Sequence, residues 1–184
     1  MTFPQVVRLY NRGPVSELVE QWVPRVYRFA LRLCNDPDVA DDLTQETFLR
    51  AWRHRGRLRD PRVLRVWLFR IATNLWRDRL RRGRFPIAQP EILSDSEQAN
   101  EPAAERLVSV KEELSLALGA MNALPNRQRE VLYLIACEEM SAAEVSQVLD
   151  ISTDAVKSSL SLARKQMRRM LLDEFDRTPS SLDA

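Results

Sequence analysis

The sequence has few of the residues on which many catalytic and metal sites depend. Its 184 residues include four glycines, two cysteines and one histidine. So few glycines disfavour glycine-rich phosphate loops and β folds with many tight turns. Cys34 and Cys137 lie far apart, and their spacing to His54 matches neither a zinc site nor a nucleophilic pair. We therefore expect a reduced protein with two thiols in its core, and no metal or other cofactor.

Long apolar runs are also missing. A transmembrane helix requires a stretch of about 18 apolar residues, and none occurs in the sequence. The first 14 residues also lack the apolar run of a signal peptide. These absences predict a soluble, cytoplasmic protein with no membrane insertion. The apolar residues still make up 45% of the chain and the charged residues 29%, which favours a packed core over global disorder.

Lysine is scarce, since 25 of the 28 basic residues are arginine. A guanidinium group binds phosphate and guanine through paired hydrogen bonds, so the excess of arginine points to nucleic acid. A genome rich in G and C, whose codons favour arginine, explains the same excess. Composition alone leaves both explanations open.

The small net charge of +2 hides a segregation along the chain. Residues 1–85 carry +9, residues 86–123 carry −5 and residues 124–184 carry −2. The segment 86–105 contains three prolines, five acidic residues and no basic residue, a composition that cannot bury a core. We expect two domains on a flexible acidic linker, which is either a simple tether or a strand suited to a channel built for nucleic acid.

The basic part of the chain has the pattern of three helices. Apolar residues at helical spacing predict a helix over 16–34, which Pro24 interrupts. Asp36 as N-cap and Pro37 at the first helical position begin the second helix. Its buried stripe comprises Leu43, Thr47, Phe48 and Ala51, and its opposite face comprises Asp42, Gln45, Glu46, Leu49 and Arg53. An exposed leucine among polar groups indicates a partner surface on that face.

Arginines crowd the next segment. Gly56 and Pro61 predict a loop there, and a third helix is expected over 64–82. Arginines with one asparagine on one face of that helix have the chemistry to bind phosphates and base edges. The candidate DNA-binding residues are Arg55, Arg57, Arg59, Arg62, Arg65, Arg70, Asn74, Arg77 and Arg81. A solvated basic face is the alternative interpretation.

The C-terminal part has the pattern of a helix-turn-helix. A helix is expected from Pro125, a capping box of Ser141 and Glu144 begins a short helix, and a longer helix is expected over 153–172. Val156, Leu160, Ala163 and Met167 repeat on its inner face. The residues expected to enter a major groove are Asp154, Lys157, Ser158, Ser161, Arg164 and Lys165. Helix pairs of this shape also serve in protein contacts.

Three motifs together resemble bacterial extracytoplasmic-function (ECF) sigma factors of the sigma-70 superfamily. Residues 40–52 (ADDLTQETFLRAW) are similar to the helix that binds core RNA polymerase in that family. Residues 67–74 (WLFRIATN), with Asp78 and the pair at 81–82, are similar to its promoter-melting and −10-recognition segment. A third set of residues is similar to the −35-reading domain of the family: Leu124, Pro125, Arg129, Val131, Leu132, Ser141, Glu144, Val145, Val156, Lys157 and Ser158. The resemblance covers about 15–84 and 107–172.

The resemblance implies an all-α fold of two small helical domains. Sigma region 2 would span 1–84, the acidic linker 85–106 and the region 4 helix-turn-helix 107–173, with a disordered tail at 174–184. The face that carries Asp42 and Leu49 would dock on the clamp of the β′ subunit, and region 4 would rest on the β flap. The arginine loop would capture a base flipped from the −10 element, which costs a few kcal/mol. An anti-sigma factor is the expected further partner, and bond formation would belong to the core enzyme, so the chain is expected to be no enzyme.

Several residues depart from the family pattern. Glu139 and Met140 form a pair before the turn where the family commonly has a glycine. Asp150 replaces the glycine usual in the turn of the helix-turn-helix, and Leu64 replaces an aromatic residue. Asp154 with Ala155 replaces Gly-Thr, and Ser159 stands where an arginine is common. The helix at 153–172 thus loses a phosphate contact and gains a carboxylate, which suits a cytosine N4 amino group.

These departures motivate an alternative from another class, a sigma-like decoy or adaptor that binds an anti-sigma factor without reading DNA. The basic residues of the N-terminal half have no use in a decoy, which favours a true sigma factor. A stand-alone helix-turn-helix regulator leaves residues 36–82 without a function. An enzyme would need a carboxylate pair, a metal cluster or an activated nucleophile, and none stands out in the sequence.

Overall fold

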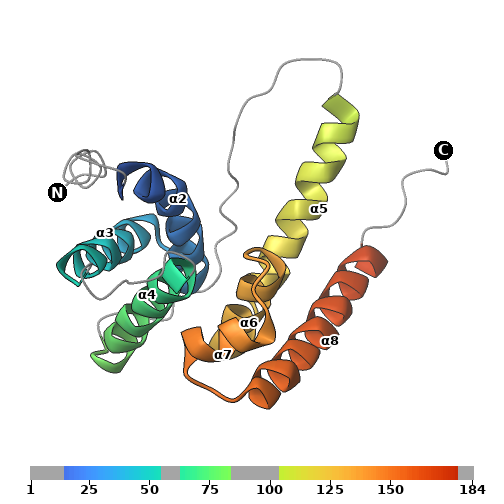
Figure 1. The fold of residues 1–184 in the computed structure, drawn as a ribbon. Coiled ribbons are helices and arrows are strands. Elements are labelled where there is room, and N and C mark those ends of the chain that lie inside the picture. The colour runs from blue at the N-terminus through green and yellow to red at the C-terminus, as the bar shows by residue number, and fades with distance from the viewer. Residues whose placement is uncertain (1–14, 55–62, 84–103, 178–184) are drawn as a thin grey trace.

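A computed structural model describes residues 15–54, 63–83 and 104–177, and their side chains at 21–54, 63–83 and 113–173. Seven α-helices and no strand occur in these ranges, as the all-α prediction requires. Figure 1 shows two groups of helices, α2 to α4 and α5 to α8. No helix within the described ranges is long and apolar enough to cross a membrane.

The N-terminal half comprises α2 (Val15–Cys34), α3 (Pro37–Arg53) and α4 (Leu64–Arg81). Asp36 caps α3 as expected, because its carboxylate accepts a hydrogen bond of 3.1 Å from the backbone N–H of Val39. Each helix contributes one phenylalanine that is almost fully buried, Phe29, Phe48 and Phe69. Phe29 and Phe69 meet edge to face, with ring centroids 5.1 Å apart. The expected stripe of α3 is buried.

The C-terminal half comprises α5 (Ala104–Asn122), α6 (Asn126–Ala136), α7 (Ala142–Leu149) and α8 (Thr153–Arg177). Two boundaries differ from the expected ones. α5 begins inside the linker expected at 85–106, and α8 continues into the tail expected at 174–184. The polar segments adjoin strongly periodic ones. The expected start of the first of these helices is therefore a few residues too late, and the expected end of the last one a few residues too early. The rest of both segments lies outside the described residues.

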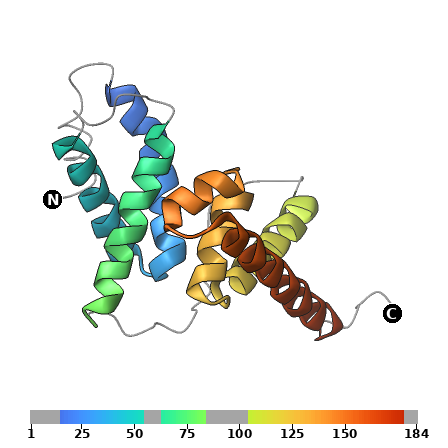
Figure 2. The same ribbon diagram turned by 60° about the horizontal axis from the view of Figure 1, so that its bottom comes forward.

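The two halves pack against each other. α4 lies against α7 and α2 lies against α6, as Figure 2 shows for the orange helix beside the green one. The rings of Phe29 and Tyr133 meet across this boundary, with centroids 5.5 Å apart. The buried residues of both halves therefore form one connected core.

The two thiols have different surroundings. Cys34 is half-buried at the end of α2, where its Sγ donates to the carbonyl oxygen of Ala30 at 3.1 Å. Burial raises the pKa of the Cys34 thiol to about 11. Cys137 is exposed, so the prediction of two core thiols is wrong for it. It follows the last residue of α6, where the chain leaves the helix and its apolar stripe.

Candidate nucleic-acid interface

α4 presents a polar face because its opposite side is fixed in the core. Leu68, Phe69 and Trp76 are buried against the neighbouring helices. Trp22 on α2 meets the Phe69 ring edge to face at 6.5 Å. The buried side of α4 is broader than a single row of residues at helical spacing, because Leu68 and Phe69 are adjacent and both buried.

Of the candidate DNA-binding residues on α4, three are exposed and two are engaged. Arg70, Asn74 and Arg81 are exposed, and Arg81 pairs with Asp78 one turn away. Arg65 and Arg77 are half-buried and bind the C-terminal half instead of facing solvent. Arg55, Arg57, Arg59 and Arg62 lie outside the described residues. The arginine face of α4 is therefore divided into an exposed part and a part occupied within the molecule.

The expected partner face of α3 is polar and partly ordered by ion pairs. Asp42 and Arg53 are exposed, whereas Gln45, Glu46 and Leu49 are half-buried. Asp42 lies 3.4 Å from the Arg79 guanidinium, and Glu46 lies 2.8 Å from Arg50 Nε. Leu49 is thus less exposed than the sequence predicted.

The helix-turn-helix has the expected geometry. The side chain of Ser141 accepts from the backbone N–H of Glu144, whose carboxylate accepts from the N–H of Ser141, so the capping box begins α7. Asp150 ends α7 in the left-handed region with φ of 55°. An aspartate tolerates this conformation, which the family's glycine usually supplies. The turn then leads into α8, where Ser152 Oγ accepts from the N–H of Ala155 at 3.2 Å.

The first turns of α8 present a polar face to solvent. Val156 and Ala163 are buried on the inner side. The exposed residues on the outer side are Asp154, Lys157, Ser158, Ser161 and Lys165. Asp154 and Lys157 are largely exposed and lie 3.7 Å apart, so the carboxylate and the ammonium group remain accessible to a ligand.

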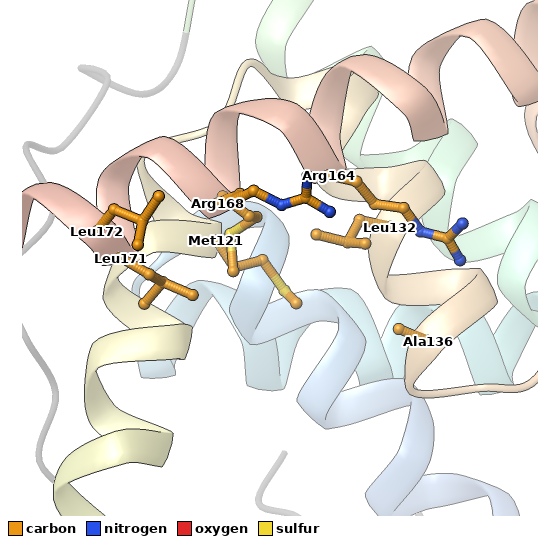
Figure 3. A pocket seen from close by; sticks show the side chains of 8 residues that line it. Met121, Leu132, Ala136, Arg164, Arg168, Leu171 and Leu172 are labelled. Atoms are coloured by element: carbon orange, nitrogen blue, oxygen red, sulfur yellow. The ribbon is translucent and has the colours of Figure 1, made fainter.

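Arg164 is also exposed, but it lies beside a second feature, an apolar groove between α5, α6 and α8. Figure 3 shows the groove, whose volume is about 550 Å³. Its lining residues are Met121, Leu132, Ala136, Arg164, Met167, Arg168, Leu171 and Leu172. Arg164 thus lines this groove, whereas Ser158 and Ser161 do not.

Four charged residues that are not among the candidate site residues join the two halves. Arg25 pairs with Glu138, and Arg129 donates to the carbonyl oxygen of Arg32. Glu130 and Glu138 are almost fully buried at this boundary. Burial raises the pKa of the Glu138 carboxyl, and the neighbouring Arg25 opposes that shift. Burial likewise lowers the pKa of the Arg129 guanidinium. Helical periodicity gave no indication of these contacts, because each contact joins one residue of the N-terminal half to one of the C-terminal half.

Two successive parts of the chain match known protein families. Residues 18–85 match Sigma-70 region 2, and residues 114–167 match Sigma-70 region 4. These two regions, in this order, define the class of sigma-70-type transcription initiation factors.

Relatives with similar sequences support a narrower assignment. The ECF RNA polymerase sigma factor SigM of Bacillus subtilis is 32% identical over 158 residues, which cover 85% of this chain and 94% of the relative. A probable RNA polymerase sigma factor, RfaY of Xanthomonas campestris, is 37% identical over 155 residues, but the match covers 82% of this chain and 38% of that longer relative. The sigma factor RpoE of Bartonella quintana, solved in complex with the anti-sigma factor NepR, shares the fold with a TM-score of 0.69. That match has 24% identity and covers 84% of this chain and 94% of the other. The chain belongs to the ECF family of RNA polymerase sigma factors.

Proposed function

We propose that the chain binds core RNA polymerase, directs it to promoters and promotes melting of the −10 element. One observation carries this proposal: both sigma regions are present in order, and each holds an exposed polar helix face on a buried apolar side. Contacts to phosphates position such a protein on DNA, whereas contacts to base edges select the sequence. The face of α4 and the face of α8 supply both kinds of group.

The roles of individual residues follow from this proposal. Arg70, Asn74 and Arg81, with the arginines of the loop at 55–62, would bind the −10 element. The start of α8, with Asp154 and Lys157, would read the −35 element in the major groove. The polar face of α3, with Asp42, Gln45, Glu46, Leu49 and Arg53, would bind the β′ clamp, and the C-terminal half would rest on the β flap. The chain would act as a non-catalytic subunit in the cytoplasm, where the polymerase transcribes the genome.

An anti-sigma factor is the further proposed partner. The RpoE structure contains such a factor, NepR, bound to its sigma factor. The apolar groove beside α8 has two arginines on its rim, so it suits an amphipathic helix with acidic residues. Such a partner would cover surfaces that the polymerase or the promoter needs.

The second candidate function is a sigma-like decoy that binds an anti-sigma factor without reading DNA. Asp154 and Ser159 favour it, because Ser159 stands where the family commonly has an arginine suited to phosphate, and Asp154 adds a carboxylate. The polar groups at the start of α8 are nevertheless exposed and arranged on one face, as DNA reading requires.

The test is transcription from fragmented genomic DNA of the source organism. Purified core polymerase is supplied with the chain, and the transcript ends are sequenced. The proposed function predicts new start sites that share two upstream elements. A chain that binds core polymerase but yields no new start sites contradicts promoter recognition and supports the decoy. No binding to core polymerase would rule out a sigma-factor role.

A further inference from the structure

The apolar groove beside α8 adjoins a part of α5 whose apolar side chains are exposed. Met121 of α5 lines the groove and is almost fully buried. Leu114 lies seven residues before it, about two turns away on the same face of the helix, and exposes 57% of its surface. On the opposite wall, Leu172 of α8 exposes 58%. Figure 1 shows that both helices extend beyond α6. Exposed apolar surface of this extent marks an interaction site.

The groove is apolar in its walls and basic at its rim. Its charged lining residues are Arg164 and Arg168, and both are exposed. Figure 3 shows that both arginines extend from α8 beside the apolar side chains. An occupant that suits this surface therefore needs an apolar side chain for the groove and a carboxylate next to it.

α5 itself has the composition of such an occupant. Residues 112 and 113 are both glutamate and directly precede Leu114 in the chain. Glu113 is exposed. At 114, 117, 118 and 121 the residues are leucine, alanine, leucine and methionine, which share one face at helical spacing. The same chain thus carries both the groove and, two turns away, a leucine beside a carboxylate.

We propose that a second copy of this chain occupies the groove, through antiparallel pairing of α5 with α5 about a two-fold axis near residues 117 and 118. Leu114 and Met121 are equally far from that axis along the helix. Leu114 of each copy therefore lies opposite Met121 of the other and enters the other groove. Such an interface uses the same patch on both copies, so it closes as a dimer.

The charges agree with this pairing. Where Leu114 of one copy enters the groove of the other, the adjacent Glu113 lies at the rim that carries Arg164 and Arg168. The two-fold axis repeats this contact, so each dimer has two acidic-to-basic contacts. Opposite charges across an interface fix its register, whereas like charges disfavour it. The pairing is thus complementary in both shape-filling and charged groups.

A dimer of this kind goes beyond the proposed function, which assigns the groove to a partner of another kind. A second copy and a partner's helix need the same apolar walls, so they cannot occupy the groove together. Dimer formation therefore lowers the concentration of chain that such a partner can bind. The interface is limited to one helix pair and its grooves, and small interfaces are weak. We expect a dimer that dissociates on dilution.

The first experiment measures the mass of the full chain by sedimentation velocity over a range of concentrations. Leu114→Ser/Leu172→Ser removes two leucines from the proposed interface. Leu116→Ser/Leu162→Ser is the matched control, because these leucines lie on the same two helices and expose 40% and 53%. Leu116 lies on the opposite side of α5 from Leu114, and Leu162 does not line the groove. The interface variant is expected to raise the dimer dissociation constant by at least about 100-fold. The control is expected to change it by less than about threefold.

The second experiment tests the contact between copies directly. Arg168→Glu and Glu113→Arg each place like charges opposite one another in a homodimer, so each should weaken association by at least about tenfold. A mixture of the two variants should recover the wild-type affinity, because each contact in the mixed dimer pairs a glutamate with an arginine. A contact within one chain cannot give recovery on mixing. Both residues are exposed, so this test stays decisive if circular dichroism shows that the leucine variants fail to fold.

A wild-type chain that stays monomeric at all concentrations overturns the proposal. A dimer that both leucine variants weaken equally, or charge variants that do not recover on mixing, overturn it as well. Binding to core polymerase is measured beside these experiments. A monomeric wild type whose polymerase binding falls only in the interface variant assigns the groove to the polymerase instead. The mass of the chain is measured without polymerase or DNA, so failure of the dimer and failure of the proposed function are distinguished.

Discussion

The two helices proposed to meet promoter DNA, α4 and α8, differ in what surrounds their polar faces. α4 is packed on both of its ends by the C-terminal half, through Arg65 and Arg77, and only Arg70, Asn74 and Arg81 of its candidate residues face solvent. α8 presents its first turns to solvent, and Asp154 there contacts only Lys157 among the ion pairs found in the described residues. The difference teaches that a polar stripe in the sequence indicates a binding face but does not show whether that face is already occupied.

The largest expected effect concerns how firmly each helix is anchored. Phe69→Ala removes a fully buried ring of α4 that contacts Phe29, so it is expected to lower the free energy of unfolding by about 3–5 kcal/mol. Leu162→Ala on α8 truncates a side chain that is 53% exposed and is expected to change it by less than about 0.5 kcal/mol. Urea unfolding followed by circular dichroism measures both. Similar losses in the two variants would show that α4 is not the more deeply anchored helix.

The next effect compares the thiols of the two halves. A pKa of about 11 instead of 9.0 lowers the thiolate fraction of Cys34 at pH 8 by roughly 100-fold. Burial also raises the pKa of Cys137, but that side chain is exposed to reagent. We expect iodoacetamide to modify Cys137 first and Cys34 much more slowly, as peptide mass spectrometry over time would reveal. The two rates should converge in denaturant, and equal rates in the native protein would contradict the buried site of Cys34.

A smaller effect tests the exposed carboxylate of α8. A carboxylate accepts from cytosine N4, whereas an asparagine pairs with adenine N6 and N7. Asp154→Asn is therefore expected to change the preferred base at one −35 position from cytosine to adenine, with a discrimination of about 1–3 kcal/mol. Selection from randomised −35 sequences by the holoenzyme measures the preference. Ser159→Ala is the control on the same helix, and an identical preference in Asp154→Asn would remove Asp154 from base reading.

The smallest effect is electrostatic and is expected on both helices. Arg70→Ala and Lys157→Ala should each lower the slope of log affinity against log salt by about one unit if the residue contacts a phosphate. Filter binding of the holoenzyme to a promoter fragment over a range of salt concentrations measures that slope. Arg127→Ala on α6 removes an exposed charge outside both faces and should leave the slope unchanged. Slopes unchanged in all three variants would place phosphate binding elsewhere.

Features that depend on a few neighbouring residues could be predicted from the sequence. The cap of α3 at Asp36 and the capping box of Ser141 and Glu144 are confirmed. Each forms within one turn of chain, so residue type and spacing determine it. The two sigma regions were recognised from residue types and their spacing within each region, which the sequence shows directly.

Features that depend on distant residues could not be predicted. Arg77 and Glu130 are 53 positions apart, and Arg65 and Glu144 are 79 positions apart. Nothing in either segment alone shows that an arginine suited to phosphate would instead meet a glutamate. The sequence therefore predicted the chemistry of these arginines and missed the partner that the fold gives them.

The most direct test of the central claim is a footprint of the holoenzyme on a promoter that it transcribes. Permanganate reports unpaired thymines at the −10 element, and DNase I reports protection at the −35 element. The account predicts both signals for the wild type, a weaker permanganate signal for Arg70→Ala and weaker −35 protection for Lys157→Ala. A wild-type chain that binds core polymerase but yields neither signal would contradict the account.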